Sequence, residues 1–276
     1  MSSTKEGLIG LSDSKKTFSF KGLFKNNYFL YALSLICFFL FWELVAVTFG
    51  KFLPRPIEVI DRVVYMFGHT LAGKTLLMHL WASLRRVFIG FAIATAIGIP
   101  LGLFMGFNKY VHAVVKPIFD LFKPMPPIAW ISLAILWFGI GETSKIFIIV
   151  IGAVVPVVIN SFNGIRLVDP DLYHVVKMLG GNHRDEIIQV SFPASLPAIF
   201  AGLQISLSMA WTTVLAAELV GAREGMGFII IQGMNLSRVD QIIGGMFVIA
   251  ITAWMISAVM TYLERWICPW KMQLKK

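Results

Sequence analysis

The amino-acid sequence predicts an all-α polytopic membrane protein with about six transmembrane helices. Apolar residues make up 57% of the 276 residues and charged residues only 14%, whereas charged residues make up about a quarter of an average soluble domain. Six windows of the chain are predominantly apolar and approach the ~20 residues that a helix needs to cross a bilayer. Because lipid offers the backbone no hydrogen-bond partner, these windows are expected to be helices.

The six windows are not equally well defined. The third is short and begins in the proline-rich run Lys123-Pro-Met-Pro-Pro127, so it crosses the bilayer only if the turn before it lies at membrane depth. The windows are 28–49, 87–107, roughly 125–140, 146–162, 199–220 and 242–263.

The lysine-rich start of the chain could be misread as a secretory signal. Residues 1–27 are rich in Ser, Lys and Gly, contain little that could be buried, and are expected to form a disordered cytoplasmic tail. The apolar window of residues 28–49 is longer than the core of a signal peptide and lacks a small-residue cleavage site. We therefore predict that it is retained as the first transmembrane helix.

Lys and Arg are distributed unequally between the two sides of the predicted bundle. Fifteen of the 24 fall in the N-terminal tail, the loops 108–124 and 164–198, and the C-terminal tail 264–276. Seven fall in the other connections; Arg85 and Arg86 lie at a membrane edge, where snorkelling explains them, as it explains Glu43. Because positive residues stay on the cytoplasmic side, both termini and loop 164–198 are predicted to be cytoplasmic. The cytoplasmic loops then account for the net charge of +9, so nucleic-acid binding is not expected.

The second window carries three glycines at every fourth position. Gly98, Gly102 and Gly106 would line one face of the helix and allow a neighbouring backbone to approach closely. Pro100 removes a backbone donor from the same helix and is expected to kink it. We interpret these residues as a packing device, with a gating role as the alternative.

The fifth window carries a polar stripe. At about 100° per residue, Gln204, Ser208 and Thr212 share one helix face, and Glu218 lies within about 40° of it. These residues are candidates for the lining of a solute pathway, since an ionisable group in lipid is costly unless it has a function. The alternative is hydrogen bonding between helices, which Ser, Thr and Gln commonly provide in membranes.

No motif in the chain points to enzyme or metal chemistry. The segment Gly68-His-Thr-Leu-Ala-Gly-Lys-Thr75 matches the P-loop expression, but no second strand ending in Asp follows it, and the charge distribution places Lys74 outside the cell. Cys37 and Cys268 form no zinc spacing or disulfide framework. The five His residues show no ligand spacing, so a metal site is not expected.

The predicted cytoplasmic loop 164–198 carries an ordered pattern. The run His174-Val-Val-Lys-Met-Leu-Gly180 is followed nine residues later by Val190-Ser-Phe-Pro-Ala-Ser-Leu-Pro197. This sequence pattern resembles the "EAA" loop of importer-type ABC permeases, whose pattern is E-A-A-x-x-x-G-x(9)-I-x-L-P. A loop this long is rarely only a connection, so we expect it to be a docking surface.

Motifs outside the loop strengthen the resemblance. From about Phe52 to Leu263 the chain resembles the nitrate, sulfonate and taurine branch of binding-protein-dependent transport inner membrane components. The resemblance implies a type I ABC importer permease fold, with a five-helix core over residues 79–263. The motifs are Phe52-Leu-Pro-Arg-Pro56, Ala82-Ser-Leu-Arg-Arg-Val87, Gly98-Ile-Pro-Leu-Gly-Leu-Phe-Met-Gly106, Trp137-Phe-Gly-Ile-Gly-Glu142 and Ala217-Glu-Leu-Val-Gly221.

The same resemblance implies a transport subunit in a bacterial inner membrane that catalyses no reaction itself. Two permease subunits, expected to be a homodimer, would form the pathway for a small anion such as a sulfonate, nitrate or taurine. Two copies of a separate ABC ATPase would hold ATP and Mg, so no cofactor is expected on this chain. An extracytoplasmic solute-binding protein would deliver the solute.

The resemblance also implies roles within the loop, whose short helices would insert into the ATPase. Gly180 is expected to end a helix in a left-handed conformation, and Pro193 to begin the fifth span. The sequence departs from the family where His174-Val175-Val176 replaces Glu-Ala-Ala, which removes an acidic group and enlarges two positions. The residues expected to couple to the ATPase are Asp171, Leu172, His174, Val175, Lys177, Leu179, Gly180, Arg184 and Pro193.

Two other functional classes are left open by the sequence. An ATP-independent secondary carrier or channel would continue to transport in membranes depleted of ATP while the ion gradient is maintained. An ATP-binding enzyme would bind ATP as the purified chain and would lose that binding in a Lys74→Ala variant.

Overall fold

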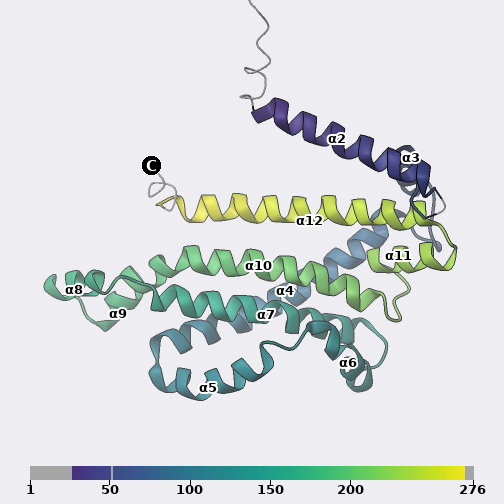
Figure 1. Ribbon diagram of the computed structural model, residues 1–276. Helices are drawn as coiled ribbons and strands as arrows, with labels where there is room; N and C mark the ends of the chain where they lie inside the picture. The colour runs from purple at the N-terminus through teal and green to yellow at the C-terminus, as the bar shows by residue number, and fades with distance from the viewer. Residues whose placement is uncertain (1–26, 51, 271–276) are drawn as a thin grey trace, which may run out of the picture. The chain divides into compact units, whose positions relative to one another are not determined.

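The computed structural model describes residues 27–50 and 52–270. Within them the regular structure is helical, apart from one isolated bridge between Leu71 and Lys74 (Figure 1). Five helices are long and apolar enough to cross a membrane, or six if a bent pair of shorter helices counts as one span. The predicted all-α membrane class is therefore confirmed. The chain divides into two compact units, Met1–Pro56 and Ile57–Lys276.

The first unit contains α2 (Asn27–Thr48), whose ends lie within one residue of the predicted first window. After α2, Arg55 forms an ion pair with Glu43 at 2.8 Å. Glu43 thus has a specific partner where the sequence predicted only snorkelling. The predicted disordered tail 1–27 lies outside the described residues except for its last position.

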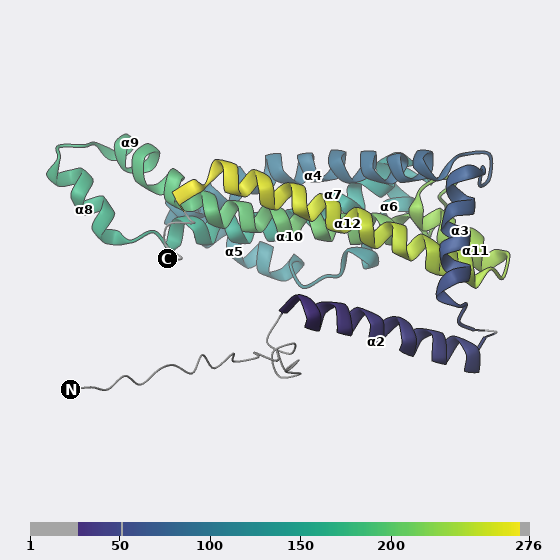
Figure 2. The ribbon, with the colours of Figure 1, turned by 90° about the horizontal axis from the view of Figure 1, so that it is seen from above.

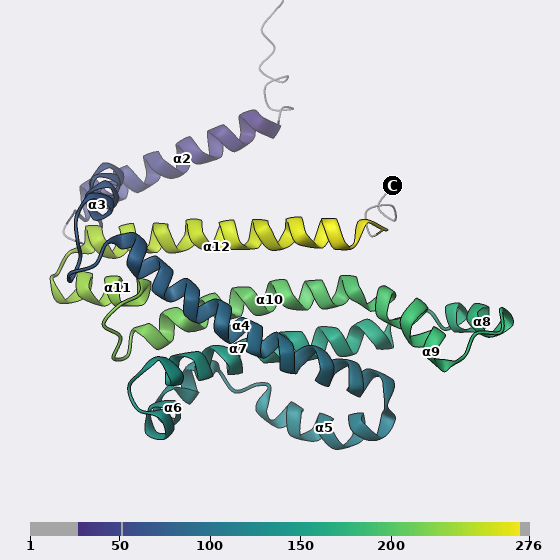
Figure 3. The ribbon, with the colours of Figure 1, turned by 180° about the vertical axis from the view of Figure 1, so that it is seen from behind.

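The second unit is built around four long helices: α4 (Leu76–Phe107), α7 (Glu142–Arg166), α10 (Phe192–Glu218) and α12 (Val239–Ile267). α7 makes most of its contacts with α4 and α10, and α12 packs on α10 (Figures 1 and 3). One apolar cluster draws side chains from all four helices. It includes Val87, Ile149, Trp211 and Met260.

The glycines of α4 bring it into direct contact with the backbone of α7. A Cβ atom built on Gly102 would lie 2.6 Å from the carbonyl oxygen of Val158, and one on Gly98 would lie 2.9 Å from the Val157 side chain. Real Cβ atoms do not approach so closely, so only glycine permits this helix separation. The packing interpretation of these glycines is confirmed, and α4 continues through Pro100.

The third predicted window belongs to a bent pair of helices. α5 (Lys109–Phe122) runs back from the end of α4, and a 3₁₀ turn (Pro127–Trp130) leads into α6 (Ile131–Phe138), with an 85° bend between the two limbs. Most of the predicted loop 108–124 is therefore a helix, residues 109–122. The cause is local: Asn108 accepts hydrogen bonds from the first amides of α5 and starts it at once.

Shorter helices lie at the two ends of the second unit. Figure 2 shows α8 and α9 at one end and α11 at the other; these ends are called the α8 end and the α11 end below. The shorter elements are α3 (Pro56–Gly68), α8 (Pro170–Met178), α9 (His183–Asp185), a π-helical segment (Glu186–Ser191) and α11 (Met226–Asn235).

α4 begins at Leu76, well before the predicted residue 87, because Thr75 caps it. The Thr75 hydroxyl accepts a hydrogen bond from the Met78 amide over 3.4 Å. Helix α3 precedes the P-loop-like segment, and the described part of the chain contains no strand on which a P-loop could be built. The match at residues 68–75 is thus a turn followed by a helix cap.

Candidate functional site

The loop between α7 and α10 is a folded helical hairpin. Asp169 caps α8 by accepting the Asp171 amide at 2.9 Å. At the other end Gly180 has a φ of +79°, and its amide donates to the Lys177 carbonyl, while the Gly181 amide donates to Val176. This is the pattern of a glycine-terminated helix, so the predicted conformation of Gly180 is confirmed.

Side-chain contacts tie α8 to the segment that leads into α10. Tyr173 and Ser191 lie 2.9 Å apart in a hydrogen bond; since Ser191 donates to the Glu186 carbonyl, the Tyr173 hydroxyl is the donor. Lys177 forms an ion pair with Glu186 at 3.5 Å. These bonds join the two arms of the hairpin and tie α8 to the start of α10.

The hairpin presents an apolar surface to its surroundings. Leu172 is 45% exposed, Val175 52% and Leu179 83%. A contiguous exposed apolar surface on a protein marks an interaction site. Of the nine residues predicted for coupling, eight are exposed on the hairpin, and Pro193 is half-buried in the first turn of α10.

Three of the four stripe residues come together beside α12. Gln204, Ser208 and Thr212 line a hollow of about 130 Å³. Gln204 donates a hydrogen bond to Glu264 of α12 over 2.8 Å, so helix-to-helix bonding describes this residue. Ser208 and Thr212 donate to carbonyls one turn earlier on α10 and are exposed. These two hydroxyl oxygens are exposed polar atoms of α10 in this hollow.

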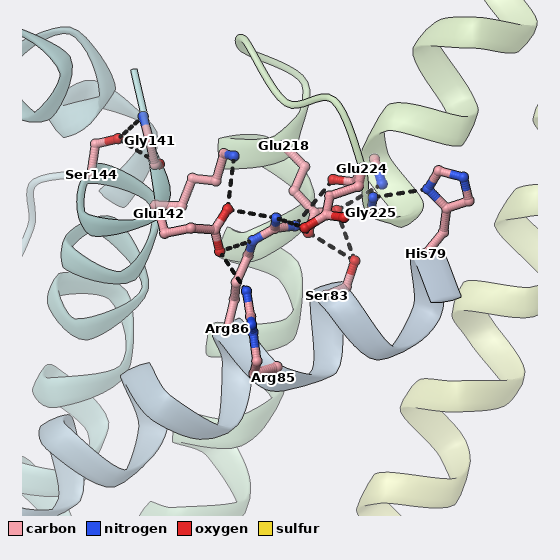
Figure 4. Close-up of polar contacts among 12 residues, drawn as sticks. His79, Ser83, Arg85, Arg86, Gly141, Glu142, Ser144, Glu218, Glu224 and Gly225 are labelled. Atoms are coloured by element: carbon pink, nitrogen blue, oxygen red, sulfur yellow. Dashed lines mark hydrogen bonds and ion pairs between the residues drawn. The ribbon is translucent and has the colours of Figure 1, made fainter. Parts of the chain in front are cut away.

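The structure separates Glu218 from this stripe. Glu218 is 1% exposed at the last position of α10. Its carboxylate contacts Arg86 at 2.7 Å, accepts from Ser83 at 2.8 Å, and accepts the Gly227 amide at 3.0 Å (Figure 4). A carboxylate with these partners is held in place, and it does not line the hollow beside α12.

Arg86 is the centre of a cluster of charged residues at the α11 end. Its side chain is 1% exposed and binds Glu142 through two nitrogens, at 2.8 and 2.6 Å. It also contacts Glu218 and, at 3.2 Å, Glu224 (Figure 4). One guanidinium thereby joins α4, α7, α10 and the connection between α10 and α11.

The outer residues of this cluster add three cations to the buried arginine and its three carboxylates. Arg85 and Lys145 each lie 3.4 Å from Glu142, and Lys74 pairs with Glu224. The Lys74 ammonium holds the pKa of the Glu224 carboxyl below its usual value. The ion cluster, as named below, consists of Lys74, Arg85, Arg86, Glu142, Lys145, Glu218 and Glu224.

Two α4 residues that precede Arg86, His79 and Ser83, hold the connection between α10 and α11 in place. The Ser83 hydroxyl oxygen accepts the Met226 amide at 2.8 Å, and Nδ1 of His79 accepts the Gly225 amide at 3.2 Å. Since Nδ1 is an acceptor, Nε2 of His79 carries the proton that it donates to the Leu71 carbonyl. A Cβ atom on Gly225 would lie 2.3 Å from the Glu218 carboxylate, so this position requires glycine.

Sequence reasoning missed most of the ion cluster. The interpretation of Arg86 as a snorkelling residue is wrong, because it is fully buried; Arg85 beside it is about half exposed, as snorkelling predicts. The available signal was the spacing of His79, Ser83 and Arg86, which places them on one helix face.

Comparison with known proteins gives consistent results. Residues 98–272 match the family described as binding-protein-dependent transport system inner membrane component. The taurine transport system permease protein of Escherichia coli is 35% identical over 79% of this chain and 80% of its own length. The nitrate import permease protein of Synechocystis is 31% identical over 83% of this chain and 85% of its own length.

A solved structure shares the fold. An inward-facing crystal form of the MetNI methionine ABC transporter contains a chain that superposes with a TM-score of 0.61. The match covers 70% of this chain and 95% of that one, at 19% identity. The expected permease-like fold is therefore confirmed.

Proposed function

Because this chain belongs to the family of binding-protein-dependent transport system inner membrane components, we propose that it is the membrane-spanning subunit of an ATP-driven importer. Two copies of a separate ABC ATPase would bind ATP and Mg and supply the energy. A second copy of this chain would complete the pathway, and an extracytoplasmic binding protein would deliver the solute. Both termini would be cytoplasmic.

The observation that carries this proposal is the folded hairpin with its outward apolar surface. A passive connection has no need to expose Leu172, Val175 and Leu179. In the proposed complex these side chains enter a groove of the ATPase. The Lys and Arg distribution supports a cytoplasmic hairpin, on the side of the membrane where the ATPase would lie.

The packing behind the hairpin suits it to act as a lever. α8 follows α7 after a short turn, and the π-helical segment continues directly into α10. Glycines bring α7 and α10 close together. A Cβ on Gly202 of α10 would lie 2.6 Å from Asn160 of α7, and one on Gly164 of α7 would lie 3.0 Å from Ser195 of α10. Closure of the ATPase would therefore move α7 and α10 as one body and tilt the pathway.

Ser208 and Thr212 are proposed to face the solute, with Gln204 at the edge of the same hollow. They offer oxygen atoms without a fixed charge, which suits a solute that must bind weakly and leave. The relatives named for taurine and nitrate favour a small anion of the sulfonate or nitrate kind.

The test uses membranes that contain the full complex. A Leu172→Asp and Val175→Asp double variant is expected to lose co-purification with the ATPase and ATP-dependent uptake of taurine or nitrate, because a charge would enter an apolar groove. Leu236→Asp is the control, since Leu236 is 57% exposed at the α11 end. Undiminished co-purification and uptake in the double variant would refute the proposal.

A further inference from the structure

Helix α5 turns its charged face toward the bundle and its apolar face outward. Tyr110 is 72% exposed, Val114 67% and Leu121 63%. The polar residues recur at helical spacing on the opposite face: His112, Lys116, Asp120 and Lys123. An outward apolar face is expected against lipid, whereas ionisable groups on a membrane helix usually face a water-filled cavity and mark a functional site. The side chains of Lys116 and Lys123 are about half exposed.

These residues line a hollow between α5 and α7. Its volume is about 160 Å³, enough for a small ion with several water molecules, since about 10–15 Å³ of such space holds one water. Phe162 and Asn163 of α7 form part of the opposite wall. The His112 ring stacks on Phe162 with centroids 4.9 Å apart, and the Arg166 guanidinium lies 5.6 Å from the same ring. The hollow is thus near the last turn of α7, at the α8 end.

The hollow is positively charged and rich in donors. Lys116 and Lys123 both pair with Asp120, so two cations face one carboxylate. Each ammonium has three N–H groups and uses one on Asp120. The side chains of His112 and Asn163 make no hydrogen bond to any other described residue, so their donors are also available.

We propose that this hollow binds a small oxyanion, the chemistry shared by a sulfonate, nitrate or phosphate ion and by a phospholipid headgroup. Lys116 and Lys123 supply the charge, and Asn163 donates from the facing helix. A structural role for the lysines alone does not explain the arrangement, because exposed pairs within one helix stabilise it only slightly. An occupant would link α5 to α7 and oppose their separation, which goes beyond the proposed pathway on α10.

The site can be tested on the full chain purified without an ATPase, so the result is independent of the proposed coupling. Calorimetric titrations in phosphatidylcholine nanodiscs would use inorganic phosphate and methanesulfonate, and native mass spectrometry would measure retained phosphatidylglycerol. A Lys116→Gln and Lys123→Gln double variant is expected to weaken anion binding at least tenfold, because charge-assisted hydrogen bonds are lost. Arg at both positions should restore it.

Lys109→Gln is the matched control. Lys109 lies on the same helix over its neighbour Tyr110 and does not line the hollow, so wild-type affinity is expected. Binding of the soluble anions identifies a free ion as the occupant, and lysine-dependent retention of phosphatidylglycerol identifies a lipid headgroup; either result supports the site. The site is refuted if neither probe binds, if the double variant binds like wild type, or if Lys109→Gln weakens binding equally.

Discussion

The two ends of the helical unit are held together in opposite ways. At the α8 end, the hairpin exposes its apolar residues, such as Val175 and Leu179, and its polar contacts lie near the surface. At the α11 end, Arg86 and Glu218 are buried, and one guanidinium joins four segments of the chain. One end leaves an apolar surface exposed, and the other holds the helices to one another.

The difference teaches where a substitution should affect stability and where it should affect transport. Removing one partner from a buried ion pair leaves an uncompensated charge, which is far more costly than the loss of an exposed pair. Substitutions at the α11 end should therefore lower the free energy of unfolding. Substitutions at the α8 end should leave stability nearly intact and reduce coupling.

Arg86→Met tests this distinction most strongly. It would leave Glu142, Glu218 and Glu224 close together without their shared cation, and we expect a loss of about 3–5 kcal/mol in the free energy of unfolding. Denaturant unfolding in detergent, followed by tryptophan fluorescence, measures it. Arg85→Met is the control beside it in the sequence and should cost less than about 1 kcal/mol. Equal losses in the two variants would contradict a special role for the buried guanidinium.

Gly225→Ala should have the next largest effect. The added Cβ would lie 2.3 Å from the Glu218 carboxylate, and the backbone has a φ of +123°. We expect a loss of about 2–3 kcal/mol from strain and displacement of that carboxylate. Gly73→Ala separates the two causes, because Gly73 also has a positive φ but no atom within 4 Å; it should cost about 1 kcal/mol. If both variants lose the same amount, the contact with Glu218 is unimportant.

Features that depend on nearby residues could be predicted from the sequence. Apolar windows located the long helices, because a span must satisfy its own backbone. The spacing of Gly98 and Gly102 predicted close helix packing, since residues four apart share a face. The conformation of Gly180 followed from the cost of a left-handed backbone for other residues.

Features that depend on residues distant in the sequence could not be predicted in this way. Arg86 meets Glu142 and Glu218 across 56 and 132 residues of sequence, and a single sequence does not specify which charges meet. Hydropathy also missed α5, because its charged face interrupts the apolar run that signals a span. On α10, helical geometry placed Glu218 near the stripe, whereas its ion pair with Arg86 holds it inside.

Gly180→Trp moves the test to the α8 end. A Cβ at this position has no atom within 4 Å, and the left-handed backbone is expected to cost about 1 kcal/mol in the free energy of unfolding. The displaced end of α8 should nevertheless uncouple ATP hydrolysis from uptake, measured together in proteoliposomes with the ATPase and binding protein. Gly180→Asn is the control, because Asn tolerates this conformation, and it should retain coupling. Normal uptake by the Trp variant would remove the hairpin from the mechanism.

Tyr173→Phe should have the smallest effect on stability and gives the finest comparison of the two ends. It removes the 2.9 Å hydrogen bond to Ser191, but Ser191 keeps its bond to the Glu186 carbonyl, so no buried group loses its last partner. We expect the variant to lose about 0.5–1 kcal/mol of local stability. Amide exchange in α8 should become faster, with little change in global unfolding. Ser83→Ala deletes one hydroxyl at the α11 end and leaves the Met226 amide without its acceptor, so its cost should be larger, about 1–3 kcal/mol. Similar global losses in these two variants would mean that the hairpin is as integral to the fold as the α11 end, and the contrast between the ends would fail.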